Sequence, residues 1–298
     1  MTPDAIPGID GDPLVYLNGA MTPLSQAKVS VLDRGFIFGD GIYEVVPVYN
    51  GKPFRMEQHM ARLFRSLASI RIDNPHTRPQ WQALVQQVID AFARQYPAQR
   101  DQFVYIQVTR GVAKRDHGFP AGVRPTVFLM SSPFARPAAE SREKGIAAVS
   151  MKDERWLHCE IKSVSLLGNV LARQYAVDRG VPEVIQFRDG YLTEGSASNI
   201  WVVKGGAIVA PPKDNLILEG IRYGLMEELA TAGGIPMHVR PVLCSEVYTA
   251  DELMLSSATK EVLAITTLDG RAVGNGPGTG APGPVYAKLR AAYDAAIA

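Results

Sequence analysis

The chain has 298 residues, enough for two domains, and its 46% hydrophobic and 20% charged content is typical of a soluble globular protein. Its formal net charge of +1 argues against a nucleic-acid-binding protein and against adsorption to an anionic membrane. No apolar run is long enough to span a bilayer, and two isolated cysteines, Cys159 and Cys244, predict neither a disulfide framework nor a metal site.

The N-terminal half mixes strands and helices without a regular strand-helix-strand alternation. Residues 1–19 contain acids and prolines but no apolar segment of the signal-peptide type, which favours a cytoplasmic protein. Asn-Gly turns between β-branched and aromatic residues predict two hairpins, and apolar residues at helical spacing predict two helices. The expected elements are a hairpin from residue 14, a strand pair at 41–56, helices at 57–70 and 81–96, and strands at 103–109 and 126–131 on either side of the loop 111–125.

A stretch with prolines and charges but no periodicity, residues 132–144, predicts a linker between domains 1–131 and 145–298. Short strands then follow closely, which is typical of a barrel-like domain. Strands are expected at 147–151, 184–188, 200–203, 207–209, 253–256 and 265–268, helices at 167–179, 221–232 and 285–297, and a loop at 273–284. The predicted fold class is α+β (mixed α/β), with a small N-terminal α/β sandwich and a larger barrel-like C-terminal domain.

Lys162 lies in the segment HCEIKSVSLLGNVLARQYA, residues 158–176. A run of apolar residues follows it, and we predict that this run is buried: Val164, Leu166, Leu167, Val170 and Leu171. Lysine is rarely buried without a partner, and most lysines on apolar segments extend the amine into water. The alternative is a lysine held in a closed site because its amine does chemistry. This segment alone favours the first interpretation.

Glu194 and the pair formed by Arg115 and His117 are also candidates for a site. Glu194 lies at a glycine turn in TEGSASNIW, and is either a surface acid or a carboxylate aimed at a cation. Arg115 and His117, in KRDHGFP, are either solvated loop residues or a cationic pair for a substrate carboxylate. Each candidate alone favours its ordinary structural role.

Two further segments could bind an anion. The predicted helix after Gly220 begins with backbone amides that have no partner within the helix, and such a start suits phosphate. The hydroxyl-rich turn SSATKEV, residues 256–262, could complete the site together with Arg62. A lysine, a carboxylate and a phosphate site are the groups that pyridoxal phosphate requires of a protein.

The chain also resembles the branched-chain and D-amino-acid aminotransferase family, the fold type IV pyridoxal phosphate enzymes. The resemblance rests on DRGFIFGDGIYEVVPVYNG, MEQHMARLFRS, VTRG, RWLHCEIKSVSLLGNVLARQYA, TEGSASNIW and SSATKEV, which follow the family's order along nearly the whole chain. Within the family, RDHGFP at 115–120 resembles the R-x-H loop of the bacterial D-amino-acid enzymes. The resemblance thus points to the D-amino-acid branch.

The resemblance implies a role for each candidate residue. Lys162 would be the Schiff-base lysine and catalytic base, and Glu194 would pair with the pyridine nitrogen. The phosphate would be bound by Arg62, Ile221, Arg222, Ser257 and Ala258. The substrate carboxylate would be held by Tyr43, Arg115 and His117, the last two supplied by the second subunit of a homodimer. Arg222, Ala258 and Ala197 depart from the family's pattern, which leaves the details of phosphate binding open.

The expected reaction moves the amino group of a D-amino acid such as D-alanine to a 2-oxo acid such as 2-oxoglutarate, by ping-pong kinetics. An L-branched-chain transaminase, an (R)-amine transaminase and an aminodeoxychorismate lyase are alternatives on the same fold. A non-catalytic protein that binds the cofactor is an alternative of another class, disfavoured because Lys162 and Glu194 are both present. The preferred donor side chain is not predicted.

Overall fold

The computed structural model describes residues 6–298. Residues 1–5, the start of the segment without signal-peptide character, lie outside the described residues. The chain divides into two compact units. The first comprises the described residues up to Ala135 together with Ile161–Leu166, and the second comprises Arg136–Glu160 and Leu167–Ala298. The first break falls inside the stretch expected to be a linker, and the domain limits 1–131 and 145–298 stay a prediction.

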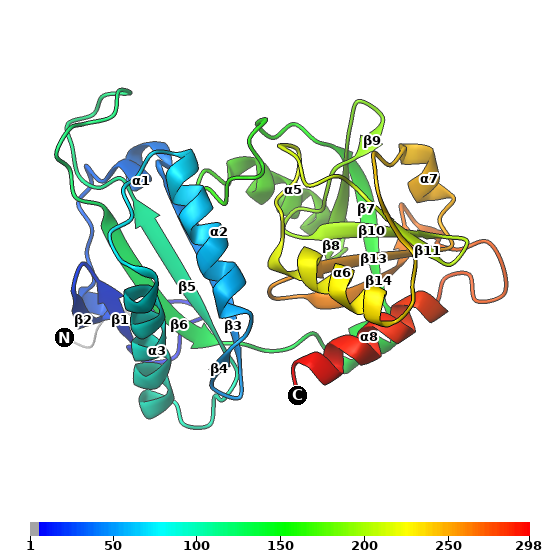
Figure 1. The fold of residues 1–298 in the computed structure, drawn as a ribbon, viewed down its shortest axis with the longest axis horizontal. Helices are drawn as coiled ribbons and strands as arrows, with labels where there is room; N and C mark the ends of the chain where they lie inside the picture. The colour runs from blue at the N-terminus through cyan, green and yellow to red at the C-terminus, as the bar shows by residue number, and fades with distance from the viewer. Residues whose placement is uncertain (1–5) are drawn as a thin grey trace. The chain divides into compact units, whose positions relative to one another are not determined.

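A six-stranded antiparallel sheet is the framework of the first unit (Figure 1). Its strands are β1 (Leu14–Leu17), β2 (Ala20–Pro23), β3 (Gly41–Tyr49), β4 (Lys52–Pro53), β5 (Gln102–Thr109) and β6 (Thr126–Pro133), in the spatial order β2-β1-β6-β5-β3-β4. Asn18, Gly19, Asn50 and Gly51 all have positive φ, between 49° and 103°. The two Asn-Gly hairpins predicted from the sequence are therefore confirmed.

Two long helices, α2 (Met56–Ser69) and α3 (Arg78–Gln95), pack on the sheet of the first unit. Met60, Leu63 and Leu67, the apolar stripe predicted for α2, lie in the core between helix and sheet. The unit also contains two short elements that the sequence did not predict, the 3₁₀ turn η1 (Leu24–Gln26) and α1 (Arg34–Phe38). Three and five residues are too few for an apolar stripe to be recognised.

A nine-stranded mixed sheet is the framework of the second unit. Its strands are β7 (Ile146–Lys152), β8 (Glu183–Arg188), β9 (Tyr191–Leu192), β10 (Asn199–Lys204), β11 (Ala207–Ala210), β12 (Met237–Val239), β13 (Glu252–Ser257), β14 (Glu261–Leu268) and β15 (Arg271–Ala272). Their spatial order is β12-β11-β10-β13-β14-β7-β8-β9, and β15 pairs with β14. The pairs β11–β12, β14–β7 and β7–β8 are parallel and the others antiparallel, which confirms the mixed α/β class.

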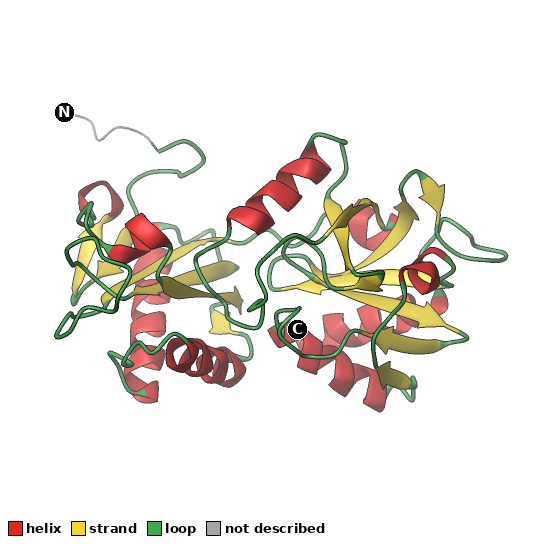
Figure 2. Ribbon diagram, turned by 90° about the horizontal axis from the view of Figure 1, so that it is seen from above, coloured by secondary structure: helices red, strands yellow, loops and turns green. Residues whose placement is uncertain are grey.

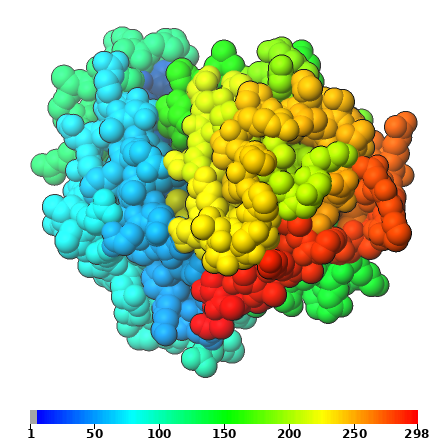
Figure 3. Space-filling model, turned by 45° about the vertical axis from the view of Figure 1, so that its right-hand side comes forward, coloured from blue at the N-terminus to red at the C-terminus, as the bar shows by residue number. Residues whose placement is uncertain are grey.

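The helices of the second unit are α4 (Ala139–Lys144), α5 (Leu167–Val177), α6 (Ile221–Ala232), α7 (Cys244–Tyr248) and α8 (Pro284–Ala296). α6 and α8 contact each other and the strands β13 and β14 (Figure 2), and in the space-filling view α8 (red) lies against the yellow segment that contains α6 (Figure 3). α4 forms inside the stretch predicted to lack periodicity, because one and a half turns show no apolar stripe. Within residues 6–298, no helix is both long and apolar enough to cross a bilayer.

The apolar run after Lys162 is not buried as predicted. Leu167, Val170 and Leu171 are 71%, 58% and 60% exposed, on the outer side of α5. The inner side of this helix is formed by Ala172 and Ala176, which pack on Val184 of β8. The prediction was wrong because apolar residues look the same in a sequence whether they face the core or lie exposed on the protein surface.

Candidate active site

Lys162 lies beside β3 in the first unit, with its amine against an aromatic ring. Its carbonyl accepts a hydrogen bond from the Tyr43 amide at 2.9 Å, and Ser163 forms a bridge with Ile42, so this segment runs along β3. Lys162 Nζ lies 4.0 Å from the centroid of the Tyr43 ring, a favourable position for an ammonium group. The half-buried lysine is therefore held at a defined place instead of extending freely into solvent.

Arg62 is part of a buried cluster in the first unit. Arg62 Nε and Nη2 donate to the two carboxylate oxygens of Glu44 at 2.6 and 2.8 Å, and His59 Nδ1 lies 2.8 Å from Glu44 Oε2. Burial raises the pKa of Glu44, but the guanidinium and His59 outweigh this effect and bring the pKa below its ordinary value. The phosphate contact of Arg62 stays a prediction.

Arg115 and His117 lie on the long loop between β5 and β6 and are exposed. Both contact Phe38 of α1, the guanidinium carbon and the imidazole centroid each 5.3 Å from the centroid of its ring. The buried Arg34 fixes the loop, because its Nη1 donates to the backbone carbonyl of Asp116 at 2.5 Å. The loop is thus anchored to its own unit, and the side chains of Arg115 and His117 are exposed.

Glu194 follows β9 in the second unit and is buried. Arg155 Nη1 lies 2.5 Å from Glu194 Oε1. The other carboxylate oxygen accepts from the Leu218 amide at 3.1 Å and from Asn199 Nδ2 at 3.4 Å. Burial raises the pKa of Glu194 above its ordinary value, and the Arg155 guanidinium opposes this shift without cancelling it.

Arg155 is shared between two carboxylates, and the sequence analysis missed it. Its Nε and Nη2 donate to Asp153 at 3.0 and 2.9 Å, on the side away from the bond to Glu194. Burial opposes ionisation of Asp153, but Arg155 lowers the pKa of Asp153 to about 2. The available signal was the position of Arg155 within the stretch RWLHCEIK, together with the need of a buried carboxylate for a cation.

The predicted helix start at Ile221 and Arg222 is confirmed as the first turn of α6. The N-cap is Gly220, which offers no side chain to the first amides, and a Cβ there would lie 2.3 Å from Asn199 Oδ1. The Arg222 side chain is buried, and its Nε donates to the Tyr293 hydroxyl of α8 at 2.9 Å. Arg222 can therefore offer an anion its backbone amide, as expected from its departure from the family's pattern.

The turn with Ser257 and Ala258 connects β13 and β14. Asn199, which contacts Glu194, pairs with Ser256 in the ladder between β10 and β13. The Glu194 carboxylate is bonded to Leu218, three residues before α6 begins. The second unit thus brings the carboxylate, the helix start and the hydroxyl-rich turn to one region of its sheet.

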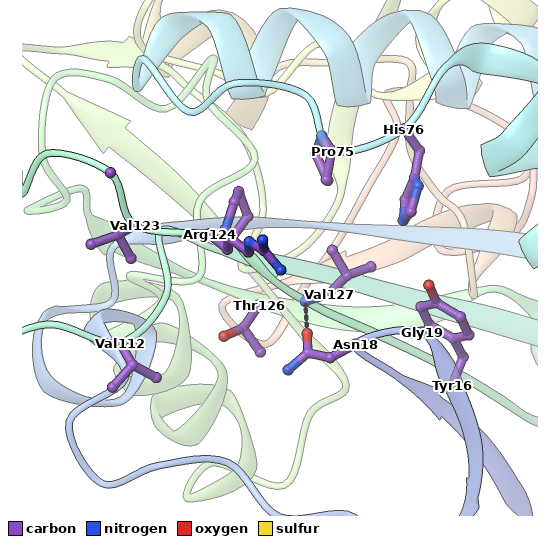
Figure 4. Close-up of a pocket in the computed structure, with 12 residues that line it drawn as sticks. Tyr16, Asn18, Gly19, Pro75, His76, Val112, Val123, Arg124, Thr126 and Val127 are labelled. Atoms are coloured by element: carbon purple, nitrogen blue, oxygen red, sulfur yellow. Dashed lines mark hydrogen bonds between the residues drawn. The ribbon is translucent and has the colours of Figure 1, made fainter.

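A separate hollow of about 800 Å³ lies in the first unit (Figure 4). Figure 4 shows Arg124, His76 and Tyr16 around it, together with Asn18, whose side chain accepts a hydrogen bond from the Val127 amide at 2.8 Å. The lining residues are Tyr16, Asn18, Gly19, Pro75, His76, Val112, Gly122, Val123, Arg124, Pro125, Thr126 and Val127. None of the ten site residues predicted from the sequence is among them, so this hollow is not the predicted site.

Comparisons with known proteins give the family of the chain. The family model described as amino-transferase class IV matches residues 41–268. The chain is 37% identical over 283 residues to a D-alanine aminotransferase of Bacillus licheniformis, covering 95% of this chain and 96% of the relative. It is 38% identical over 283 residues to that of Staphylococcus haemolyticus, covering 94% and 96%. The structure is similar to the branched-chain amino acid aminotransferase of Escherichia coli, with a TM-score of 0.88 at 25% identity, covering 96% and 94% of the chains.

Each unit by itself contains side chains that fit part of pyridoxal phosphate, an aromatic aldehyde with a basic nitrogen and a phosphate. The first unit holds a lysine amine on an aromatic ring, and the second holds a buried carboxylate and a helix start capped by glycine. These are the groups that would bind the aldehyde, the nitrogen and the phosphate. The chain belongs to the amino-transferase class IV family and is a pyridoxal-phosphate-dependent aminotransferase.

Proposed function

We propose that the enzyme transfers the amino group of a D-amino acid, such as D-alanine, to a 2-oxo acid such as 2-oxoglutarate. The observation that carries this proposal is the 37–38% identity to D-alanine aminotransferases along about 95% of the chain. The exposed pair of Arg115 and His117 supports it, because a guanidinium and an imidazole on an anchored loop can bind a substrate carboxylate.

In this proposal, Lys162 anchors the cofactor and is later the base. The bound cofactor supplies an electron sink for the charge that develops at the substrate Cα. The Lys162 amine would take the proton from the substrate Cα and deliver it to the carbon that was the aldehyde carbon of the cofactor. The Tyr43 ring, 4.0 Å from Nζ, limits the positions that the amine can take. The same residues would act in the reverse order on a 2-oxo acid acceptor, which would give ping-pong kinetics.

Glu194 would keep the pyridine nitrogen protonated. Burial raises the pKa of its carboxylate, and Arg155 compensates the negative charge only in part. A protonated ring nitrogen would be a second cation next to this carboxylate and would favour the ionised form. The phosphate would be bound by the amides of Ile221 and Arg222 at the α6 start, with the other contacts from Ser257, Ala258 and Arg62.

The substrate carboxylate would be held by Tyr43 and by Arg115 and His117 of the second subunit in a homodimer. A dimer is supported by large apolar side chains on the surface of both units. Phe36 is 73% exposed in the first unit, and Leu167 is 71% exposed in the second. Apolar surface of this kind is typical of protein interfaces, and a second copy of the chain would cover it while placing Arg115 in trans.

Mixed dimers test the proposal that Arg115 acts in trans. Lys162→Ala and Arg115→Ala proteins are each expected to have little activity with D-alanine. If Arg115 acts across the dimer, a hybrid of the two contains one site with both native residues. Mixing through reversible dissociation should then restore about a quarter of the native sites. No recovery in mixtures shown to contain hybrids would mean that Arg115 acts within its own subunit.

An L-branched-chain transaminase is the second candidate, favoured by the structural similarity to the Escherichia coli enzyme. A donor comparison distinguishes the two reactions. We expect 2-oxoglutarate to be consumed with D-alanine and not with L-leucine or L-valine. The opposite result would reject the D-specific proposal and support the branched-chain reaction. Consumption of a substrate without any 2-oxo acid acceptor would indicate a lyase.

The cytoplasmic location predicted from the sequence stays a prediction. Cys159 and Cys244 are both free thiols. Burial raises the pKa of the Cys159 thiol to about 11, which keeps it protonated and unreactive. Unpaired thiols agree with a reducing compartment.

A further inference from the structure

Glu183, at the first residue of β8, is a buried carboxylate to which none of the roles above applies. Its side chain is completely buried. Oε1 accepts from the backbone amide of Ser196 at 3.0 Å and also from the Ser196 hydroxyl. Oε2 accepts from the Ser198 hydroxyl and from Lys260 Nζ, both at 2.8 Å. The charge is thus matched by one ammonium group and by several hydrogen-bond donors, as a stable buried carboxylate requires.

The serine donors bind Glu183 to the turn that carries Glu194. Ser196 and Ser198 lie in the stretch that begins with Glu194 and Gly195, and the Gly195 amide donates to the Ser198 carbonyl at 2.7 Å to close this turn. A Cβ on Gly195 would lie 2.3 Å from Ser198 Oγ and 3.1 Å from Glu183 Cδ. The Glu183 carboxylate therefore lies against the turn and accepts hydrogen bonds from two of its serines.

Lys260 binds the same carboxylate to the turn between β13 and β14. Its backbone amide donates to Ser257 Oγ at 2.9 Å, which closes the turn that contains Ala258. Its Nζ reaches Glu183 and also donates to the Pro182 carbonyl at 3.1 Å. Lys260 thus connects the hydroxyl-rich turn to the start of β8.

We propose that Glu183 and Lys260 are positioning residues that hold the Glu194 turn and the Ser257–Ala258 turn at a fixed separation. One cofactor can then be bound at both its ring nitrogen and its phosphate. The inference rests on the proposed roles of Glu194, Ser257 and Ala258. A buried pair keeps both partners in place because either ion alone is costly, so removing one releases the turn that it held.

Pyridoxal phosphate and pyridoxal differ only in the phosphate, so they distinguish release of the Ser257–Ala258 turn from release of the Glu194 turn. The full-length protein, freed of cofactor, is titrated with pyridoxal phosphate or with pyridoxal, and binding is followed by visible absorption. Lys260→Met should weaken pyridoxal phosphate about tenfold and pyridoxal less than about twofold, because only the phosphate turn is released. Glu183→Gln should weaken both ligands about tenfold, because it also releases the Glu194 turn.

Matched variants separate positioning from general loss of structure. Lys152→Met removes a lysine that is 79% exposed in the same unit and should change neither dissociation constant. Lys260→Arg keeps the cation and should retain the native affinity for pyridoxal phosphate. This comparison with Lys260→Met remains possible if Glu183→Gln fails to fold. The inference is overturned if Lys260→Met weakens both ligands equally or leaves both unchanged. Its failure differs from that of the proposed site: if Glu194→Gln also leaves pyridoxal binding unchanged, the role of Glu194 itself is wrong.

Discussion

Two buried carboxylates, Glu44 in the first unit and Glu194 in the second, are each paired with an arginine, yet their pKa values shift in opposite directions. Arg62 gives Glu44 two hydrogen bonds, and His59 adds a third. Arg155 gives Glu194 one bond and binds Asp153 with its other nitrogens. Burial raises the pKa of both carboxylates; the contacts with Arg62 and His59 outweigh this effect at Glu44, whereas the contact with Arg155 does not outweigh it at Glu194.

The difference indicates separate tasks for the two clusters. Glu44 is fully compensated inside its own unit, so its pair is part of the packed structure. The negative charge of Glu194 is compensated only in part, because Arg155 also binds Asp153. A ligand cation such as a pyridinium nitrogen would complete the compensation. The first carboxylate should therefore be needed for stability and the second for catalysis.

Removing Glu44 should give the largest loss of stability. Glu44→Gln leaves Arg62 buried without its counter-ion, and breaking a buried pair in this way costs about 3–5 kcal/mol. We expect a loss of this size in the free energy of unfolding of the cofactor-free protein, measured by urea denaturation. A loss below about 1 kcal/mol, the size of an average substitution, would show that the cluster is not a structural pair.

Removing the charge of Glu194 should reduce catalysis and spare stability. Glu194→Gln is expected to lower kcat by about 10²–10³-fold, the usual effect of losing one preorganised electrostatic group. The free energy of unfolding of the cofactor-free protein should not fall, because Arg155 keeps Asp153 as its partner. Steady-state kinetics with D-alanine and a urea titration measure the two effects. A stable variant with native kcat would contradict the comparison.

The two carboxylates should also give opposite pH dependences. The pKa of Glu44 is lowered in the folded state, so its contribution to stability is complete above the unfolded value of 4.5 and is lost as the pH falls through the lower folded value. The pKa of Glu194 is raised, so its ionised form costs stability at neutral pH, and acid relieves that cost as the pH falls through the raised folded value. Urea midpoints at several pH values should show the difference between native protein and Glu44→Gln shrinking in acid. Any stability that Glu194→Gln gains at neutral pH should also disappear in acid. Parallel curves of urea midpoint against pH for the native protein, Glu44→Gln and Glu194→Gln would contradict the assignment.

An exposed ion pair provides the smallest expected effect. Glu140 and Lys144 on α4 lie 3.1 Å apart and are both more than 70% exposed. Glu140→Gln should change the free energy of unfolding by less than about 0.5 kcal/mol, because water and salt screen such pairs. A change as large as that of Glu44→Gln would mean that burial does not explain the contrast.

The secondary structure was predicted well where the signal is local. The Asn18-Gly19 and Asn50-Gly51 turns and the apolar stripe of α2 need no knowledge of distant residues. The outward apolar side of α5 was not predicted, because the burial of Leu167 and Leu171 depends on what the helix faces. Short elements such as α1 and α4 contain too few residues for a pattern.

The residues of the candidate site were also predicted only where the signal is local. Lys162 and Glu194 were found because they lie in short stretches that the family shares. Their supporting residues were missed: Arg155 is 39 residues from Glu194 in the chain, and Lys260 is 77 residues from Glu183. No local pattern relates residues so far apart, and only the folded sheet shows that they are partners.

The most direct test of the D-specific reaction is a half-reaction without any acceptor. The holoenzyme is mixed separately with D-alanine and with L-alanine, and the visible absorption band of the bound cofactor is recorded. We predict that the band disappears with D-alanine only and returns when 2-oxoglutarate is added. Loss of the band with L-alanine only would contradict the account, because the substrate carboxylate would then lie on the side opposite to that proposed for Arg115 and His117.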